Sequence, residues 1–479
     1  MRILMTSSEA VPYSKSGGLA DVSSSLSISL GRLGHDVRII LPDYGLTDDS
    51  GFSPVDTEIS VSIGGKEQNI SILEQKVNDI TVYLISHPYF TDRAGIYGDT
   101  SFAPYHDNLL RFTLMSKTAA VLCKQIGWIP DILHCHDWTT GFLPYLIRQD
   151  KTFKETKSVF TIHNLAYQGE FPRLDLLLAD IPSDESMLSD STVDARVNMM
   201  KCALLHADTI TTVSPTYAKE IQSKQQGCGL DKILKDRNRD LYGILNGIDL
   251  EEWNPSVDRY LPVQFDSDSM EKKKLVKKEL QKRFDLPEND EIPVISMVSR
   301  IAEQKGFYEL CQGTPSVLEQ ILSEMKVQVL IVGTGDEKIE EKLMTLNRLH
   351  ENLSVNLVFS NEAAHLVEGG SDFFLMPSRY EPCGLNQMYS MRYGTVVIAR
   401  RTGGIADSVT DAEEAGGTGF LYDEISGSGI YAAVKRAVDV YYNDRKTYEE
   451  MRVRGMEKDF SWKNSAQEYV KVYHETTKG

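Results

Sequence analysis

Apolar and polar residues follow one another in blocks along the chain, and the blocks have the periods of strands and helices. Residues 2–7, RILMTS, form a short apolar run near the start. Apolar residues then recur at spacings of three and four, on one face of a helix, at Leu19, Val22, Leu26, Leu30 and Leu33. Gly34 is predicted to end this helix, and DVRIILP at 36–42 to form the next strand. A strand, a helix and a strand in this order predict a βαβ unit and a parallel sheet.

The same alternation continues through the rest of the chain. Further strands are predicted at 131–136, 158–163, 209–214 and 242–247, and a second series at 293–300, 327–333, 354–360, 372–378 and 395–400. Helix-like stretches separate most of these strands, and no internal repeat is evident. The pattern predicts an α/β protein of two doubly wound domains, divided near 245–260.

The length of 479 residues agrees with two domains, since single cores rarely grow beyond ~250–300 residues. We place the first domain at 1–250, the second at 251–455 and a C-terminal helical segment at 456–479. This last segment carries aromatic residues such as Trp462 and Tyr469. It either closes the second domain as an ordinary helix or packs back on the first domain.

The charge of the chain restricts its partners. The 51 lysines and arginines against 69 aspartates and glutamates give a formal net charge of −18, which repels nucleic acid and anionic membranes. No apolar run approaches the ~20 residues of a membrane span. The opening MRILMTSSEA lacks the features of a signal peptide. We therefore expect no nucleic-acid or membrane partner and a cytoplasmic location, although a plastid protein without its transit peptide would look the same.

The cysteines point to structural rather than chemical roles. The six cysteines form no CxxC pair, which favours buried or incidental thiols in a reducing compartment. His134 and His136 flank Cys135 and would point the same way along a strand, as two zinc ligands could. Nothing nearby completes a ligand set, so we expect no metal. Cys383 has no evident base to make it a nucleophile.

The unusual polar residues and glycines gather just past the carboxyl ends of the predicted strands, which is where open α/β sheets bind ligands. In the first half they are Glu9, Lys15, Gly17, Gly18, Asp21, Asp137, Trp138, His163, Asn164, Asn246, Gly247 and Asp249. In the second half they are Arg300, Lys305, Gly333, Gly335, Asp336, Glu381, Gly384, Leu385, Thr402, Gly403 and Gly404. Two such edges facing each other would form a cleft between the domains.

The stretch SKSGGLADV at 14–22 has the residues of an anion-binding loop. Gly17 and Gly18 stand where a loop turns into a helix, and Lys15 adds a positive charge. The dinucleotide fingerprint GxGxxG and the Walker loop are both absent here. By itself the glycine pair is equally consistent with a plain structural turn.

Three further features come from strand ends. Arg300 and Lys305 are two cations five residues apart on an acidic protein, which suggests a diphosphate site unless they are ordinary surface charges. Glu381 lies among glycines near a helix start and could bond sugar hydroxyls. A lone histidine is usually structural, but the position of His163 beside Asn164 favours a function.

Taken together, these segments resemble bacterial glycogen synthases and plant starch synthases. The motifs that carry the resemblance are SSEAVPYSKSGGLADV, HCHDWTTG, TIHNLAYQG, VSPTYAKEI, LNGIDLEEWNP, SRIAEQKG, VGTGD and SRYEPCGLNQMYSMRYGT. They run in order from residue 1 to about 475 without large gaps. The ordered set is far more specific than any single motif in it.

The resemblance implies a GT-B fold, in which two Rossmann-like domains face each other across a cleft. It implies transfer of glucose from ADP-glucose to the non-reducing end of an α-1,4-glucan such as glycogen, with retention of configuration and without a cofactor. Retention often means a covalent carboxylate intermediate; this family is thought instead to react on one face through a short-lived ion pair.

The resemblance also assigns roles to residues of this chain. It implies catalytic roles for His163, Arg300, Lys305 and Glu381. It implies donor contacts at Lys15, Gly17, Gly18, Asp21, Asp137, Asn246, Gly384, Leu385, Thr402, Gly403 and Gly404. Glu9 and Tyr97 correspond to the acceptor side.

Two departures from the family pattern and several rival functions accompany this interpretation. Ser16 replaces a usual threonine, and Phe359 and Ser360 stand where a tyrosine often contacts the adenine. The rivals are a GT-B enzyme that uses UDP-glucose, a glucan phosphorylase, a nucleotide-binding oxidoreductase and a non-catalytic glucan-binding protein. A phosphorylase needs a pyridoxal phosphate lysine, and both half-fingerprints for a dinucleotide are incomplete.

Overall fold

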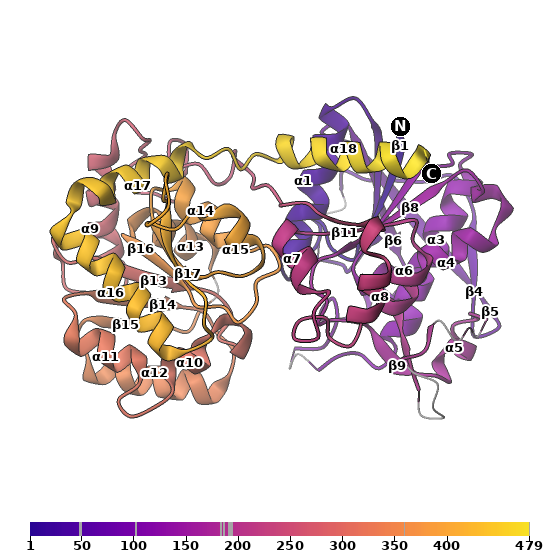
Figure 1. Cartoon of the computed structure of the whole chain (residues 1–479). Coiled ribbons are helices and arrows are strands. Elements are labelled where there is room, and N and C mark those ends of the chain that lie inside the picture. The colour runs from indigo at the N-terminus through magenta and orange to yellow at the C-terminus, as the bar shows by residue number, and fades with distance from the viewer. Residues whose placement is uncertain are drawn as a thin grey trace. The chain divides into compact units, whose positions relative to one another are not determined.

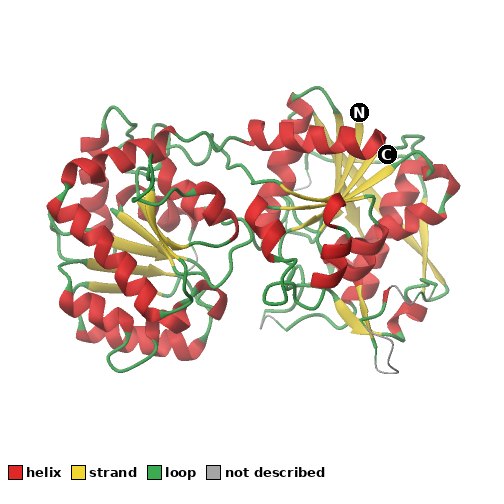
Figure 2. Ribbon diagram, in the orientation of Figure 1, coloured by secondary structure: helices red, strands yellow, loops and turns green. Residues whose placement is uncertain are grey.

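The protein is described by a computed structural model, which covers residues 1–46, 50–100, 103–182, 184, 187–189, 195–358 and 360–478. The chain folds into two compact units (Figure 1). Unit 1 consists of Met1–Gly247 and Trp462–Gly479, and unit 2 of Ile248–Ser461. In each unit helices cover both faces of a central sheet (Figure 2), as the α/β prediction requires. No helix in the described part of the chain is both long and apolar enough to cross a membrane.

The sheet of unit 1 is parallel over most of its width. Its strands are β1 (Arg2–Thr6), β2 (Asp36–Pro42), β3 (Ser53–Pro54), β4 (Ile59–Ile63), β5 (Lys66–Val77), β6 (Ile80–Ser86), β7 (Ile132–His136), β8 (Lys157–Ile162), β11 (Thr209–Thr212) and β12 (Leu241–Gly243). They lie in the order β12-β11-β8-β7-β1-β2-β6-β5-β3, and β4 pairs with β5. Pairing is parallel from β12 to β6 and antiparallel beyond it. β9 (Glu170–Pro172) and β10 (Arg196–Asn198) pair separately.

The helices of unit 1 include one from the far end of the chain. They are α1 (Gly18–Arg32), α2 (Pro88–Thr91), α3 (Asn108–Gln125), α4 (Leu143–Gln149), α5 (Asp175–Leu178), α6 (Met199–His206), α7 (Pro215–Glu220), α8 (Asp231–Asp236) and α18 (Trp462–Lys478). In Figure 1, α18 (yellow) lies beside α1 (indigo). The helix face predicted at Val22, Leu26 and Leu30 is buried together with Tyr469 and Tyr473 of α18 in one apolar cluster.

Unit 2 has a fully parallel sheet. Its strands are β13 (Val294–Val298), β14 (Gln328–Val332), β15 (Leu353–Asn356), β16 (Phe373–Met376), β17 (Val396–Arg400) and β18 (Gly419–Tyr422), in the order β15-β14-β13-β16-β17-β18. Its helices are α9 (Lys273–Arg283), α10 (Phe307–Cys311), α11 (Val317–Glu324), α12 (Glu337–Leu349), α13 (Asn361–Gly370), α14 (Asn386–Arg392), α15 (Gly403–Ser408), α16 (Gly427–Asn443) and α17 (Arg445–Glu457).

The strand order of each sheet reverses once, and the reversal fixes where a ligand can bind. In unit 1 the chain builds outward from β1 to β2 and β6, then returns to β7 on the other side of β1. In unit 2 it builds from β13 to β15 and returns to β16. Loops diverge at the carboxyl ends of the strands on either side of such a reversal, which opens a crevice there. The switch points are therefore β1 with β7 and β13 with β16.

Most of the predicted strands are confirmed, with shifts at their ends, but some elements were missed. The predicted strands at 242–247 and 354–360 were too long, because β12 ends at Gly243 and β15 at Asn356. The prediction also left out β3 to β6, β9, β10 and β18. The hairpin of β4 and β5 alternates buried and exposed positions, as a sheet with one solvated face does, so it lacks the apolar run of the central strands.

The packing of α18 leads to a prediction about stability. Tyr469 is fully buried in the cluster of unit 1, so Tyr469→Ala should lower the free energy of unfolding of unit 1 by about 3–5 kcal/mol. Urea titration read by hydrogen exchange of peptides from each unit should show a lower midpoint for residues 1–247 alone. Lys463→Ala, at an exposed position of the same helix, is the control and should leave the midpoint in place. An unchanged midpoint in Tyr469→Ala would show that α18 does not stabilise unit 1.

Candidate functional site

The glycine loop that follows β1 already holds an anion, and the anion belongs to the protein. The carboxylate of Glu9 accepts hydrogen bonds from the Ser16 and Gly17 N–H groups, the latter at 3.3 Å. The Ser16 hydroxyl donates to it at 2.8 Å and the Tyr97 hydroxyl at 2.5 Å. Glu9 is 2% exposed, and burial raises the pKa of Tyr97 well above its usual value. The N–H groups of this loop are thus oriented toward a carboxylate, and Glu9 is the carboxylate that they bind in this structure.

Lys15 and Asp21 form a pair of their own at the start of α1. The Lys15 Nζ lies 2.8 Å from the Asp21 Oδ1, and about half of the lysine side chain is exposed. Asp21 is in the first turn of the helix, where a negative charge is favoured. An exposed pair of this kind contributes about 0–1 kcal/mol, so Lys15 can exchange its partner at little cost. Gly17 precedes the helix and Gly18 begins it.

Asp137 joins the ends of two neighbouring strands, β7 and β8. Its N–H donates to the Thr161 carbonyl at 3.0 Å. Its Oδ1 accepts the His163 N–H at 2.8 Å and the Asn164 N–H at 3.4 Å. The backbone of Asp137 has φ 56° and ψ 179°, a region that costs roughly 1–3 kcal/mol for a residue with a side chain. Burial raises the pKa of this carboxyl to about 7, against the opposing effect of the two N–H donors.

The ring of His163 contacts a second histidine at the same strand ends. Its Nε2 lies 2.9 Å from the Nδ1 of His136, which is fully buried. The rings of His136 and His134 lie against each other in a tilted arrangement, with centroids 4.2 Å apart. Burial lowers the pKa of His163 to about 3 and holds that of His136 well below its usual value, so both rings are neutral near pH 7. In the described part of the chain, no group of three or more His, Cys, Asp or Glu side chains is arranged to hold a metal.

Asn246 follows β12 and has an open acceptor. It is 5% exposed, and its Oδ1 has no hydrogen-bond partner among the described residues. A buried acceptor of this kind is costly unless a ligand or water completes it. Asn246 is therefore available to bond a hydroxyl that enters the site.

In unit 2, Lys305 and Glu381 meet across the switch point of β13 and β16. The Lys305 Nζ lies 2.7 Å from the Glu381 Oε2, and this carboxylate is largely buried. The Ser378 hydroxyl donates to the same oxygen at 3.0 Å. Arg300 extends into solvent, with Gln304 as its partner at 3.4 Å. The two cations predicted to act together thus differ, since Lys305 has a counter-ion and Arg300 is exposed.

The glycines of unit 2 bring strand-end loops into backbone contact. Gly403 has φ 43°, and a Cβ there would lie 1.9 Å from the Glu381 carbonyl oxygen. The Gly404 N–H donates to that same carbonyl at 3.2 Å, so the start of α15 fixes the loop of Glu381. Gly333 (φ 152°) allows a similar close approach at the loop of Arg300, because a Cβ at this position would lie 1.8 Å from the Ser299 carbonyl oxygen. These glycines position the charged loops through close packing.

The remaining predicted residues lie at the same edges. Thr402 is fully buried and precedes α15, whereas Gly384 and Leu385 precede α14. Ser360 caps α13 by accepting the Ala363 N–H at 3.2 Å. Phe359, named with it for the adenine site, lies outside the described residues. Sequence reasoning missed two partners, His136 for His163 and Ser378 for Glu381.

A signal for both missed residues was present in the sequence. His136 ends its predicted strand and His163 ends the next one, and the carboxyl ends of adjacent parallel strands lie together. Ser378 stands three residues before Glu381 at the end of another strand. Strand adjacency, which topology decides, is what turns these positions into contacts.

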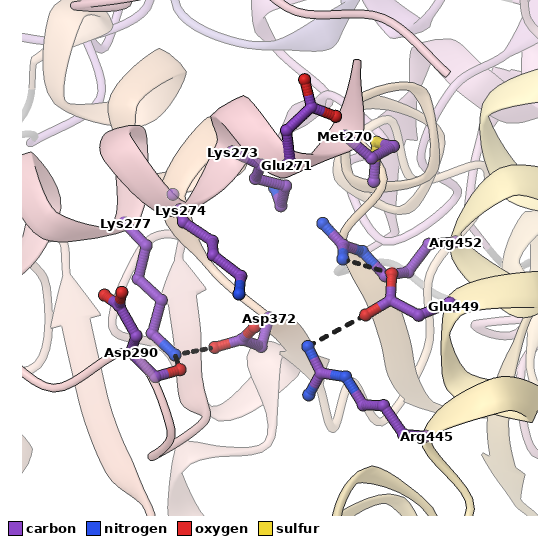
Figure 3. A pocket seen from close by; sticks show the side chains of 11 residues that line it. Met270, Glu271, Lys273, Lys274, Lys277, Asp290, Asp372, Arg445, Glu449 and Arg452 are labelled. Atoms are coloured by element: carbon purple, nitrogen blue, oxygen red, sulfur yellow. Dashed lines mark hydrogen bonds and ion pairs between the residues drawn. The ribbon is translucent and has the colours of Figure 1, made fainter. Parts of the chain in front are cut away.

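A cavity of about 240 Å³ in unit 2 lies elsewhere, lined by side chains of α9 and α17 (Figure 3). Five of its charged side chains form ion pairs: Lys277 pairs with Asp372 at 2.8 Å, and Glu449 pairs with Arg445 and Arg452. Asp372 immediately precedes β16 and accepts the N–H of Val294, the first residue of β13. The cavity therefore lies at the amino ends of the strands, opposite the edge where such sheets bind ligands.

Comparison with known proteins gives matches along the whole chain. Residues 2–236 match the starch synthase catalytic domain, and residues 278–457 match glycosyl transferases group 1. A glycogen synthase of Treponema denticola is 40% identical, over 99% of this chain and 98% of that protein. A glycogen synthase of Myxococcus xanthus is 42% identical, over 99% of both chains.

Solved structures agree with these matches. The catalytic domain of starch synthase IV from Arabidopsis thaliana, solved with ADP and acarbose bound, gives a TM-score of 0.90 at 30% identity. The match covers 100% of this chain and 99% of that one. A sucrose-phosphate synthase from Thermosynechococcus elongatus shares the fold, with a TM-score of 0.62 at 16% identity.

The low pKa of His163 predicts how stability depends on pH. His163 titrates at about 3 in the folded protein and at its ordinary 6.5 when unfolded, so the unfolded chain binds more protons between these values. The contribution of neutral His163 to the free energy of unfolding is therefore complete above pH 6.5 and is lost as the pH falls toward 3. His163→Gln should therefore flatten the fall in unfolding free energy between pH 6.5 and 4, by up to about 1.4 kcal/mol per pH unit.

Urea titrations at several pH values would measure this slope. His106→Gln, at an exposed position of the same unit, is the control and should keep the wild-type slope. A variant at position 163 whose slope equals that of the wild type would show that His163 is not held neutral by the fold.

Proposed function

The chain belongs to the family of bacterial glycogen synthases and starch synthases, which are glycosyltransferases, and from this premise we propose its donor, acceptor and site. The donor is ADP-glucose, and the acceptor is the non-reducing end of an α-1,4-glucan. Glucose is transferred with retention of configuration. The observation that carries the proposal is the pair of Lys305 and Glu381 at the switch point of unit 2, because it sets a cation and a carboxylate where a sugar diphosphate would need both.

Lys305 and Arg300 are proposed to stabilise the leaving ADP. Negative charge grows on the diphosphate as the glycosidic bond breaks, and preorganised positive groups lower the energy of that state most. Among the described residues, the Lys305 ammonium donates a hydrogen bond to Glu381 alone, which leaves two of its donors for phosphate oxygens. Arg300 is exposed and can bind two oxygens with its planar guanidinium. Lys15 is proposed as a third cation. Its surface ion pair with Asp21 contributes little energy and can be exchanged for a contact with phosphate.

Glu381 is proposed to hold the sugar, with no role as a nucleophile. One of its oxygens accepts hydrogen bonds from both Lys305 and Ser378. A carboxylate neutralised in this way is a weak nucleophile, but its remaining lone pairs can bind sugar hydroxyls. This supports reaction on one face of the sugar, in which the departing phosphate accepts the proton of the acceptor hydroxyl.

In unit 1, His163 and Asn246 are proposed to bind the glucosyl group. Asp137 fixes the backbone of His163, whose carbonyl oxygen is proposed to stabilise the glucosyl cation. The open Oδ1 of Asn246 accepts a hydroxyl. Glu9 and Tyr97 were predicted on the acceptor side. Glu9 accepts hydrogen bonds from Tyr97 and from the glycine loop, and we propose that the two residues shape the acceptor side through this loop. We also propose a cytoplasmic location, with which the lack of a CxxC pair in the sequence agrees.

The donor proposal is tested by a panel of ADP-, UDP- and GDP-glucose with glycogen, reading radiolabel in precipitated polymer. ADP-glucose should give a kcat/KM at least ~10-fold above that of UDP-glucose, a difference of about 1.4 kcal/mol. Release of labelled glucose and phosphorolysis of glycogen are measured in parallel, which separates hydrolysis and phosphorylase activity from transfer. Equal rates, or a preference for UDP-glucose, would contradict the ADP assignment.

The role of the two cations gives a second prediction. Lys305→Ala and Arg300→Ala should each lower kcat by ~10²-fold or more, about 2.7 kcal/mol, because they act on charge that develops in the transition state. The donor KM should rise less. The double variant should lose less than the sum of the two, since both cations act on one diphosphate. EDTA should leave the activity intact.

Two further variants sharpen this test. Lys305→Arg should also be impaired, because a planar fork does not replace a compact ammonium. Lys338→Ala, at an exposed position of unit 2, is the control and should keep wild-type kinetics. Near wild-type kcat in Lys305→Ala, or activity that EDTA abolishes and Mg²⁺ restores, would overturn the assignment.

A further inference from the structure

His136 is a buried polar group that the proposed reaction does not use. It ends β7, none of its surface is exposed, and its Nδ1 lies 2.9 Å from the Nε2 of His163. Its other ring nitrogen, Nε2, is buried and has no hydrogen-bond partner among the described residues. The ring thus directs its one hydrogen bond at His163.

This geometry determines which ring nitrogens carry protons. One hydrogen lies between the two neutral rings, and either ring could supply it. If His163 donated, the Nε2 of His136 would carry a buried N–H without an acceptor, and orphaned N–H groups are the rarer defect in folded proteins. If His136 donates from Nδ1, its Nε2 is a bare nitrogen and needs no acceptor. With His136 as the donor, the Nε2 of His163 accepts the hydrogen bond. The ring proton of neutral His163 is then on Nδ1.

The ring of His136 is also held by a neighbouring histidine, His134. The ring of His134 packs against it, with centroids 4.2 Å apart and planes inclined by 33°. His134 is held in turn by the Tyr473 hydroxyl at 2.7 Å and the Thr161 hydroxyl at 2.5 Å. Tyr473 is a fully buried residue of α18. The C-terminal helix therefore supports a row of rings that ends at His163.

We propose that His136 is a positioning residue that fixes the ring and the tautomer of His163, so that His163 presents Nδ1–H as a hydrogen-bond donor to a sugar hydroxyl oxygen. The part of this statement that concerns sugar rests on the proposed function. His163 is then held by two consecutive residues at the end of β7. Asp137 holds its backbone, and His136 holds its ring. A ring held in one orientation does not have to be ordered when substrate binds.

The tautomer is tested first, on the whole protein without substrate. Nitrogen-15 NMR of histidine-labelled protein separates protonated from bare ring nitrogens, and His163→Gln and His136→Asn identify the two signals by their loss. We expect both rings to carry the proton on Nδ1. A His163 protonated on Nε2 would overturn the proposal, whatever the enzyme does with sugar nucleotides.

Kinetics test the positioning role. His136→Phe keeps a ring of similar size but cannot donate, and kcat should fall ~10–100-fold with a donor KM within about twofold. His136→Asn places an N–H donor near the position of Nδ1 and should recover most of that loss. Cys135→Ala is the matched control, because Cys135 is buried in the same strand and points to the other face of the sheet.

The possible results separate the two proposals. An unchanged kcat in His136→Phe, or an equal loss in Cys135→Ala, would contradict the positioning role. No rescue by His136→Asn in a folded protein would contradict the hydrogen bond as its cause. If wild-type protein transfers glucose from no donor, the proposed function fails, while the NMR result still decides the tautomer.

Discussion

Parallel strand pairing around one reversal of strand order is the constraint on which both units depend. It brings the carboxyl ends of β1 and β7 together in unit 1, and those of β13 and β16 in unit 2. The loops leave such a reversal in opposite directions, so side chains at the strand ends can meet there. Glu9 and Asp137 follow the first pair of strands, and Lys305 and Glu381 follow the second. The amino-end cavity shows the contrast, because its buried pair of Lys277 and Asp372 lies at the opposite edge of the sheet.

Charged groups at both switch points have hydrogen-bond or ion-pair partners within the protein. Glu9 occupies the N–H groups of its own glycine loop, and Glu381 holds Lys305. An unpaired charge in a partly buried site is costly, and these pairs hold each loop in shape. Groups that are already oriented lose little entropy at the moment of reaction, which is the physical basis of electrostatic preorganisation.

The C-terminal helix links the stability of unit 1 to the geometry of its site. α18 buries Tyr469 and Tyr473 against the sheet, and Tyr473 bonds His134 beneath the rings of His136 and His163. The strain at Asp137 is maintained by the same surroundings, because its carboxylate satisfies the backbone N–H groups at the end of β8. A residue more than 300 positions away in the sequence thus helps to orient the strand ends of the site.

The sequence by itself determined the fold class, most strands and the family, because buried parallel strands leave apolar runs and the strand-end motifs are distinctive in order. It placed Lys15, Asp137, His163, Lys305 and Glu381 at strand ends, since that position is local information. Tertiary structure decided what each of them touches. The pairs of His163 with His136 and of Lys305 with Glu381 depend on which strands become neighbours. That adjacency is set by packing over long sequence distances, so no local pattern of residues contains it.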